Sequence, residues 1–114
     1  MANTRVYHLK FAAIYPLYVE KLARKDHTLD ELNQIIEWLT GYDAPAIQAQ
    51  ITDDVDLETF FKNATINPRA SLITGVICGI RVENIADPLM QQIRYLDKLV
   101  DEVAKGKAMN KVLR

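Results

Sequence analysis

The chain has 114 residues, of which 49% are hydrophobic and 25% are charged, and its formal net charge is −1. These values are typical of a globular domain and argue against an intrinsically disordered chain. The length is near the commonest domain size, so we expect one α-helical domain over residues 1–114 with a core of its own.

The cysteine count and the hydropathy pattern indicate the cellular compartment of the protein. Cys78 is the only cysteine, so no internal disulfide can form, which is typical of a reducing compartment. Residues 1–5 show mixed polarity rather than a secretion signal, and the uncharged run 70–80 is far shorter than the ~20 residues of a membrane span. The sequence therefore predicts a cytoplasmic protein without a membrane partner.

Charge is divided unevenly along the chain. Residues 1–27 carry five bases and two acids (+3), residues 28–64 carry one base and eight acids (−7), and residues 65–114 carry eight bases and five acids (+3). An acidic middle between basic ends either steers self-association or a charged partner, or is a solvated acidic surface.

The N-terminal third predicts a short extended segment and then two helices. Residues 5–9 are compatible with extended backbone. A helix is expected over about residues 12–25, and Pro16 restricts its start because proline fits best in a first turn. The next helix is the clearest, because Thr28 and Glu31 form a capping box and Gly41 follows as a C-terminal stop.

Acidic residues mark the starts of further helices. Asp43 can cap a short helix through about Thr52, and Asp56 can cap another through about Asn63. Asp87-Pro88 combines a cap with a proline at the first helical position, before a long apolar stripe that ends near Gly106. A last short helix is expected over residues 108–113. The sequence thus predicts an all-α, compact bundle of five to seven helices.

The central run 70–80 is the most informative segment, and Asn67-Pro68 predicts a helix start just before it. Wound at about 100° per residue, the run separates a small-residue face from an apolar face. The small face consists of Ser71, Thr74, Gly75, Cys78 and Gly79. The Ile, Val and Thr residues of the run 70–80 keep a strand as the competing prediction. If the run is a helix, its small face would either pack against a crossing helix or line a pocket.

Few residues suggest chemistry. If the small face lines a pocket, the candidate liners are Tyr7, His8, Tyr15 and Arg81. A nucleophilic Cys78 would need a positioned base, and the run itself supplies none. The two histidines lack metal-ligand spacing, and no cofactor motif is present, so we expect neither a metal nor a cofactor.

Two further features concern partners. Trp38 lies off the apolar stripe of its predicted helix, and with Tyr42 it suggests a second packing surface for another segment or another subunit. Arg81, Glu83, Asp87 and Arg94 form a charged cluster that could hold an anion or form salt bridges. A helix-turn-helix around Gly79 is a weaker alternative, because the segment after the turn is acidic and would repel nucleic acid.

Several segments together resemble a small bacterial family of uncharacterised proteins, domain of unknown function 2200. They are Asn3-Thr-Arg-Val-Tyr-His-Leu9, Tyr15-Pro-Leu-Tyr18, Trp38-Leu-Thr-Gly-Tyr42, Ser71-Leu-Ile-Thr-Gly-Val-Ile-Cys-Gly79 and Asp87-Pro-Leu-Met-Gln-Gln-Ile-Arg-Tyr-Leu-Asp-Lys-Leu99. The resemblance implies a bacterial, cytosolic, single-domain protein, and it supplies no activity, cofactor or catalytic residue.

Two functional hypotheses follow. The first is a non-catalytic interaction or binding protein, a homodimer or a partner of another protein, that acts through a helical surface. The second is a small-molecule-binding or catalytic domain with a pocket at the small face of residues 71–79. Nucleic-acid binding is the third and weakest hypothesis.

Overall fold

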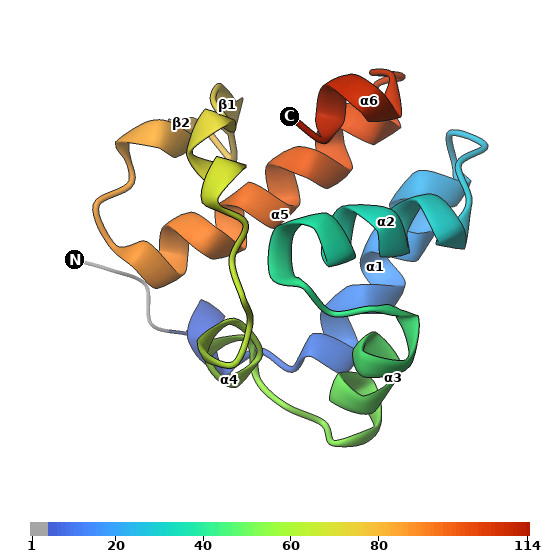
Figure 1. The fold of residues 1–114 in the computed structure, drawn as a ribbon, viewed down its shortest axis with the longest axis vertical. Coiled ribbons are helices and arrows are strands. Elements are labelled where there is room, and N and C mark those ends of the chain that lie inside the picture. Colours follow the sequence, from blue (N-terminus) through green and yellow to red (C-terminus); the bar gives the residue numbers. More distant parts are fainter. Residues whose placement is uncertain (1–4) are drawn as a thin grey trace.

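The computed structural model describes residues 5–114, and over this range the chain is mostly helical (Figure 1). The α-helices are α1 (Phe11–Ala23), α2 (Leu29–Thr40), α3 (Ala44–Thr52), α4 (Leu57–Lys62), α5 (Pro88–Ala104) and α6 (Met109–Val112). Three short 3-10 helices are η1 (Val6–His8), η2 (Pro68–Leu72) and η3 (Val82–Asn84). Strands β1 (Val76–Ile77) and β2 (Ile80–Arg81) pair as an antiparallel hairpin. The predicted helical fold class is confirmed.

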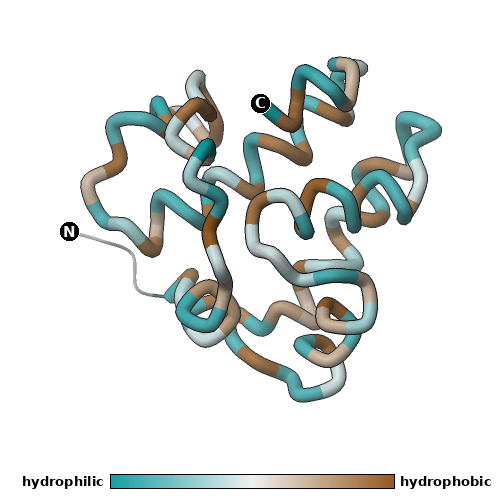
Figure 2. The backbone as a smooth tube through the Cα atoms, viewed as in Figure 1, coloured by the Kyte–Doolittle hydropathy of each residue, from teal (hydrophilic) through white to brown (hydrophobic). Residues whose placement is uncertain are grey.

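Helices α1, α2 and α5 pack against one another and form the centre of the core. Apolar residues on one side of α2 and one side of α5 are buried there, and the tube in Figure 2 alternates between apolar and polar along both helices. The buried residues of this stripe are Leu32, Ile35, Ile36 and Leu39 in α2, and Ile93, Leu96, Leu99, Val100 and Val103 in α5. Burial of this face, at about 25 cal/mol per Å² of apolar surface, is what stabilises the bundle.

The ends of α2 follow the local signals in the sequence. The Thr28 hydroxyl accepts a hydrogen bond from the Glu31 backbone N–H at 3.2 Å, and the Glu31 carboxylate accepts one from the Thr28 N–H at 3.0 Å. This reciprocal pair satisfies two of the backbone donors that a helix start leaves free. Gly41 ends the helix with φ +80°, a left-handed conformation that glycine adopts without strain.

Aspartates begin three other helices as predicted. The Asp43 carboxylate accepts from the Ala46 N–H at 3.0 Å, and that of Asp56 accepts from the Thr59 N–H at 2.8 Å. Asp87 accepts from the Leu89 N–H at 2.9 Å and so caps α5. The carboxylates also suit the positive end of each helix dipole.

The N-terminal segment corrects two expectations. Residues Val6–His8 form a 3-10 turn rather than an extended segment, because buried Tyr7 donates a hydrogen bond to Asp87 and draws the turn onto the start of α5. Helix α1 begins at Phe11, so Pro16 lies inside the helix rather than in its first turn. Packing of Phe11 offsets the missing hydrogen bond, since its ring stacks on Phe60 with centroids 4.2 Å apart.

The predicted central helix is wrong. Asn67 does cap a helical start, with its side chain accepting from the Arg69 N–H at 2.8 Å, but the 3-10 turn ends at Leu72. The chain then forms the β1–β2 hairpin, in agreement with the competing strand prediction. Gly75 has φ +114°, a conformation that no helix contains and that only glycine adopts readily.

The hairpin turn explains why the helix fails. Cys78 and Gly79 occupy the two central positions with φ +53° and +79°, as a type I′ turn between antiparallel strands requires. Glycines cost about 1 kcal/mol each inside a helix, and the β-branched residues beside them favour strands. The tight turn uses the same glycines at no such cost.

Candidate functional site

The small-residue face does not exist as a surface, because its members lie on different pieces of structure. Ser71 is exposed at the end of η2, and Thr74 is exposed in the link to the hairpin. Cys78 and Gly79 are at the hairpin tip, and no other atom lies within 4 Å of the position that a Gly79 Cβ would take. None of these five residues lines either of the two depressions described below. Because residues 70–80 do not form a helix, the helical face on which both predicted uses depended is not formed.

Gly75 is the member with the closest packing against a helix. Its N–H donates to the Glu83 carboxylate at 3.0 Å, and a Cβ at this position would meet Lys98 Cε at 3.0 Å. The hydrogen bond from Gly75, with the help of Arg81 at 2.8 Å, lowers the pKa of Glu83 to about 2. The hydrogen bond ties the start of the hairpin to η3, and the space beside Gly75 is filled by Lys98 of α5, so both contacts are structural.

The four predicted pocket liners do not face a common cavity. Tyr7 is buried against Asp87, whereas His8 is exposed, with Nδ1 3.5 Å from the Asp56 carboxylate. The Tyr15 hydroxyl donates to Asn33 at 2.5 Å and so links α1 to α2. Arg81 is exposed on β2 and pairs with Glu83, whereas Asp87 accepts from Tyr7 and Arg94 pairs with Asp97. The predicted charged cluster is therefore divided into three parts, the Arg81–Glu83 pair, Asp87 and Arg94.

Trp38 and Tyr42 find their packing partners within the chain. The Tyr42 hydroxyl donates to the Phe60 carbonyl at 2.7 Å, and the two rings lie 4.8 Å apart. Trp38 is half-buried against the core, and its carbonyl accepts from Asn67 at 3.1 Å. These contacts tie the C-terminal end of α2 to α4 and to the start of η2.

A groove between η1, α1 and α5 is the strongest candidate site, with a volume of about 240 Å³. We call it the α1–α5 groove. Its wall is mostly apolar, and two leucines at the wall are about half open to solvent: 45% of Leu9 and 58% of Leu17 is exposed. The residues that line it are Val6, Leu9, Ile14, Leu17, Tyr18, Leu57, Ile93, Arg94 and Asp97.

One end of the groove is polar and tightly bonded. The Tyr18 hydroxyl donates to Asp97 Oδ1 at 2.5 Å, and Arg94 Nη1 donates to Asp97 Oδ2 at 2.8 Å. Burial, followed by the nearby Asp97 charge, raises the pKa of Tyr18 well above its ordinary value, so the hydroxyl stays protonated. Arg94 also reaches Cys78 Sγ at 3.5 Å, which brings the hairpin tip to this end.

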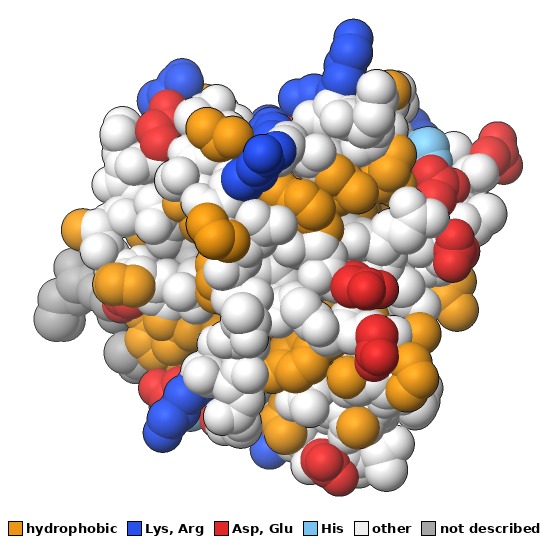
Figure 3. All heavy atoms as spheres, in the orientation of Figure 1, with side chains coloured by type: hydrophobic (Ala, Val, Ile, Leu, Met, Phe, Trp, Pro, Cys, Tyr) orange, Lys and Arg blue, Asp and Glu red, His pale blue; other side chains and the backbone are white. Residues whose placement is uncertain are grey.

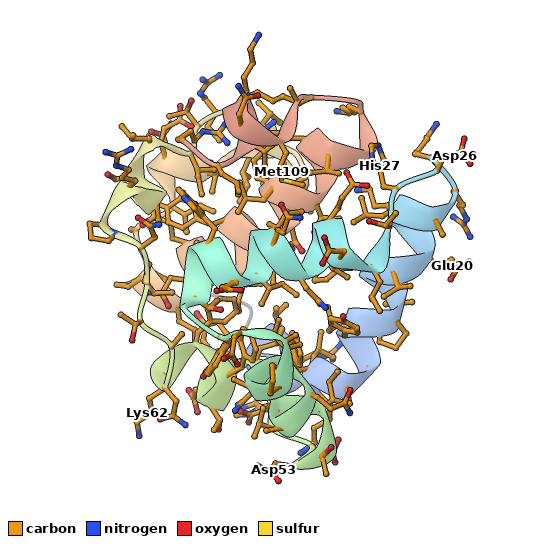
Figure 4. The ribbon with its side chains drawn as sticks, turned by 45° about the vertical axis from the view of Figure 1, so that its right-hand side comes forward. Glu20, Asp26, His27, Asp53, Lys62 and Met109 are labelled. Carbon is orange, nitrogen blue, oxygen red and sulfur yellow. The ribbon has the colours of Figure 1, made fainter. Side chains whose placement is uncertain are left out.

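A second, wider depression of about 720 Å³ lies between α4 and the start of α5. Glu58 and Lys62 on its wall are exposed. Figure 4 shows Lys62 at the outer edge of the molecule. The same figure shows Asp53, which follows α3, at the edge as well. Such side chains keep water in the depression, so it is a weaker candidate than the α1–α5 groove.

The face of the molecule shown in Figure 3 carries acidic side chains over α2 and α3 and basic side chains near its upper edge. Among residues 5–114, no three His, Cys, Asp or Glu side chains gather as metal ligands. The helices of the same range are too short or too polar to cross a membrane.

The sequence patterns missed most of this groove. Leu9, Leu17, Tyr18 and Ile93 all lie in segments that carry the family resemblance, but none of them was singled out as a candidate site residue. Arg94 was expected in a charged cluster with Arg81, Glu83 and Asp87, and its observed partner Asp97 was not part of that cluster. The i, i+3 spacing of Arg94 and Asp97 on α5 is the only local signal for the observed pair.

The fold and the groove define a small, mostly helical protein with an apolar groove that is polar at one end. The chain belongs to the bacterial family described as "Uncharacterized protein conserved in bacteria (DUF2200)", whose model matches residues 5–114. This confirms the family resemblance in the sequence.

The structure is also similar to the crystal structure of the uncharacterised protein SP1917. The two chains are 44% identical, with a TM-score of 0.91 over 98% of this chain and 93% of the other. No curated protein matches the sequence.

Proposed function

We propose that the protein is a non-catalytic protein-binding module whose α1–α5 groove takes an aliphatic side chain of a partner. The exposed leucines at an apolar groove are the observation that carries this proposal. Leaving about half of a leucine in water forgoes part of the about 1.5–3 kcal/mol that its burial gives. A partner that covers Leu9 and Leu17 would recover it.

The size of the groove favours a side chain over a free ligand. Pockets for drug-sized molecules usually hold about 300–1,000 Å³, and the α1–α5 groove holds about 240 Å³. Apolar pockets of small size are common at the centres of protein interfaces, where one inserted side chain supplies much of the affinity.

A catalytic role has less support. Cys78 is exposed, but the groups near its thiol are Arg94 and Tyr18, and neither is a general base near neutral pH. The helix-turn-helix alternative required a helix over residues 67–80, which the structure replaces with a 3-10 turn and a hairpin.

A selection of random dodecapeptides displayed on phage tests the proposal. We expect selected peptides to bind the wild type and the Leu29→Glu variant but not Leu17→Glu. Leu29 is a matched control, because 52% of it is exposed, against 58% of Leu17, and it lies outside the groove. Equal binding of the peptides to all three proteins, or no enrichment at all, would contradict the proposal.

A homodimer is the case of this proposal in which the partner is a second copy of the chain. Light scattering after size-exclusion chromatography measures it directly. A dimer at micromolar concentration that Leu17→Glu dissociates, and Leu29→Glu does not, would make the second copy the partner. A strictly monomeric wild type would exclude self-association and leave other proteins as partners.

The cytoplasmic location of the protein also stays a prediction.

A further inference from the structure

Three cations surround one buried carboxylate where α6 packs against the end of α5 (Figure 1). Arg114 donates to both oxygens of Glu102 at 2.7 Å, and the ammonium groups of Lys107 and Lys98 lie 3.5 Å and 3.8 Å from its Oε2. We call these four residues the Glu102 cluster. Among residues 5–114, none of the three cations has another ion-pair partner. Three positive charges and one negative charge leave the cluster with a net charge of +2.

Neighbouring acids do not balance this charge. Burial raises the pKa of Glu102, but Arg114, Lys107 and Lys98 lower it below its ordinary value, so its single negative charge is already counted at neutral pH. The adjacent Asp101 has cations of its own, because Lys105 lies 3.0 Å and Lys21 3.4 Å from its oxygens. Over residues 98–114 the chain carries five bases and two acids. The surplus is therefore a property of this whole end of the molecule.

The Lys98 ammonium is held in place with its hydrogen bonds unmade. Its distance of 3.8 Å to Glu102 Oε2 is beyond the about 3.2 Å of an N–H···O hydrogen bond, and it forms none with other residues of the described range. Only 14% of the side chain is exposed, and Lys98 Cε fills the space beside Gly75. The ammonium nitrogen still touches solvent, since within residues 5–114 Arg94 Nε is the atom that is both fully covered and unbonded. A ligand from outside can therefore reach the Lys98 donors.

We infer that the Glu102 cluster binds the phosphate group of a small molecule, with Lys98 and Lys107 as the donors to its oxygens. Both nitrogens lie close to the same carboxylate oxygen, so they are at most about 7.3 Å apart, the sum of 3.5 Å and 3.8 Å. Two oxygens of one phosphate can bridge such a pair through charge-assisted hydrogen bonds of about 2.8 Å.

The charge of the ligand follows from the charge of the cluster. A phosphate dianion balances a net charge of +2, whereas a carboxylate would leave one positive charge uncompensated. Partly buried cations attract an anion more strongly than fully solvated ones, because less water screens them. The cluster shares no residue with the wall of the α1–α5 groove, so the inference does not rest on the proposed function.

Inorganic phosphate, titrated into the full chain and followed by NMR, tests the inference. The pH is slightly alkaline, where phosphate is mostly a dianion, and sodium chloride keeps the ionic strength constant. We expect saturable shifts of the backbone amides of Lys98, Glu102 and Lys107. Shifts that do not saturate, or that sodium chloride alone produces equally, would overturn the inference.

Single neutral variants separate a site from a general positive field. Lys107→Gln and Lys98→Gln should each weaken phosphate binding by on the order of tenfold, the usual worth of a hydrogen bond to a charged group. Lys111→Gln is the matched control, because it removes the same charge from an exposed position on α6 that has no ion pair with Glu102. We expect less than about a twofold effect there. Equal weakening by Lys111→Gln and Lys107→Gln would contradict a defined site.

The Lys107→Gln result stands even if Lys98→Gln unfolds the chain, because Lys107 is 39% exposed and its side chain is not part of the core. Unchanged affinity in a folded Lys107→Gln variant would overturn the inference. Methyl phosphate then distinguishes the sources of the phosphate group. Binding of both compounds assigns the site to a phosphate ester, and binding of inorganic phosphate alone assigns it to the free ion; either result supports the inference.

Discussion

Replacing Glu102 with glutamine tests how the C-terminal end of the fold is held. The Glu102 side chain in α5 is only 7% exposed, and Arg114 donates to both of its oxygens at 2.7 Å. Lys107 lies 3.5 Å and Lys98 3.8 Å from Oε2. The Glu102→Gln variant keeps the shape of this side chain and removes the charge that three cations surround.

The size of the effect follows from burial. Removing one partner of a buried ion pair costs about 3–5 kcal/mol. Here the cations border solvent, with 14% of Lys98, 14% of Arg114 and 39% of Lys107 exposed, so water can compensate part of the loss. We therefore expect the free energy of unfolding to fall by about 3 kcal/mol, which lowers Tm by roughly 12 °C in a chain of this size.

The same contacts give the loss a pH dependence. Burial alone would raise the pKa of Glu102, but the hydrogen bonds and charge of Arg114, with Lys107 and Lys98, lower it below the ordinary value of 4.5. A carboxylate with a depressed pKa in the folded state stabilises the protein above its unfolded pKa, and loses this effect as the pH falls through the folded value. The difference between wild type and variant should be full at neutral pH and shrink at pH values below 4.5.

Urea denaturation at neutral and acidic pH measures both effects. The exposed Glu37 on α2 provides the control, because Glu37→Gln removes an equal charge outside any buried ion pair and should change stability by less than about 0.5 kcal/mol. The reasoning would be refuted if Glu102→Gln behaved like Glu37→Gln, or if its loss were the same at both pH values.

Two further variants test local structure by the same denaturation assay. Cys78→Asn should raise stability by about 0.5–1 kcal/mol, because Asn-Gly suits a type I′ turn whose first residue has φ +53°; a lower midpoint would show that the Cys78 contact with Arg94 outweighs the strain. Thr28→Ala should lower stability by about 1 kcal/mol through loss of the α2 cap. Thr74→Ala, at an exposed position without a cap, is the comparison, and equal effects of the two alanine variants would argue against a capping contribution.

The amino-acid sequence determined the elements that depend on local physics. Caps at Thr28, Asp43, Asp56 and Asp87 act through backbone donors only two or three residues away, so the helices that follow them were predictable. The apolar stripes of α2 and α5 predicted which faces are buried, since a helix places residues three and four apart on one side.

The central segment shows where local reasoning stops. Asn67-Pro68 starts a helical turn as predicted, but whether the turn continues depends on competition between a helix with two costly glycines and a hairpin that uses them. Contacts distant in sequence favour the hairpin, including the hydrogen bond from Gly75 to Glu83 and the packing of Ile73 in the core. No periodicity within residues 70–80 contains that information.

Tertiary structure alone decided the candidate site. The α1–α5 groove joins Leu9 and Leu17 to Arg94 and Asp97, which are about eighty positions away in the chain, and each belongs to an element with its own local reason to form. Apolar residues of one stripe look alike in sequence whether they are buried at the centre or left at the edge of a groove. Only the packing of η1 and α1 against α5 determines which leucines stay in water and which donor of Arg94 has no acceptor.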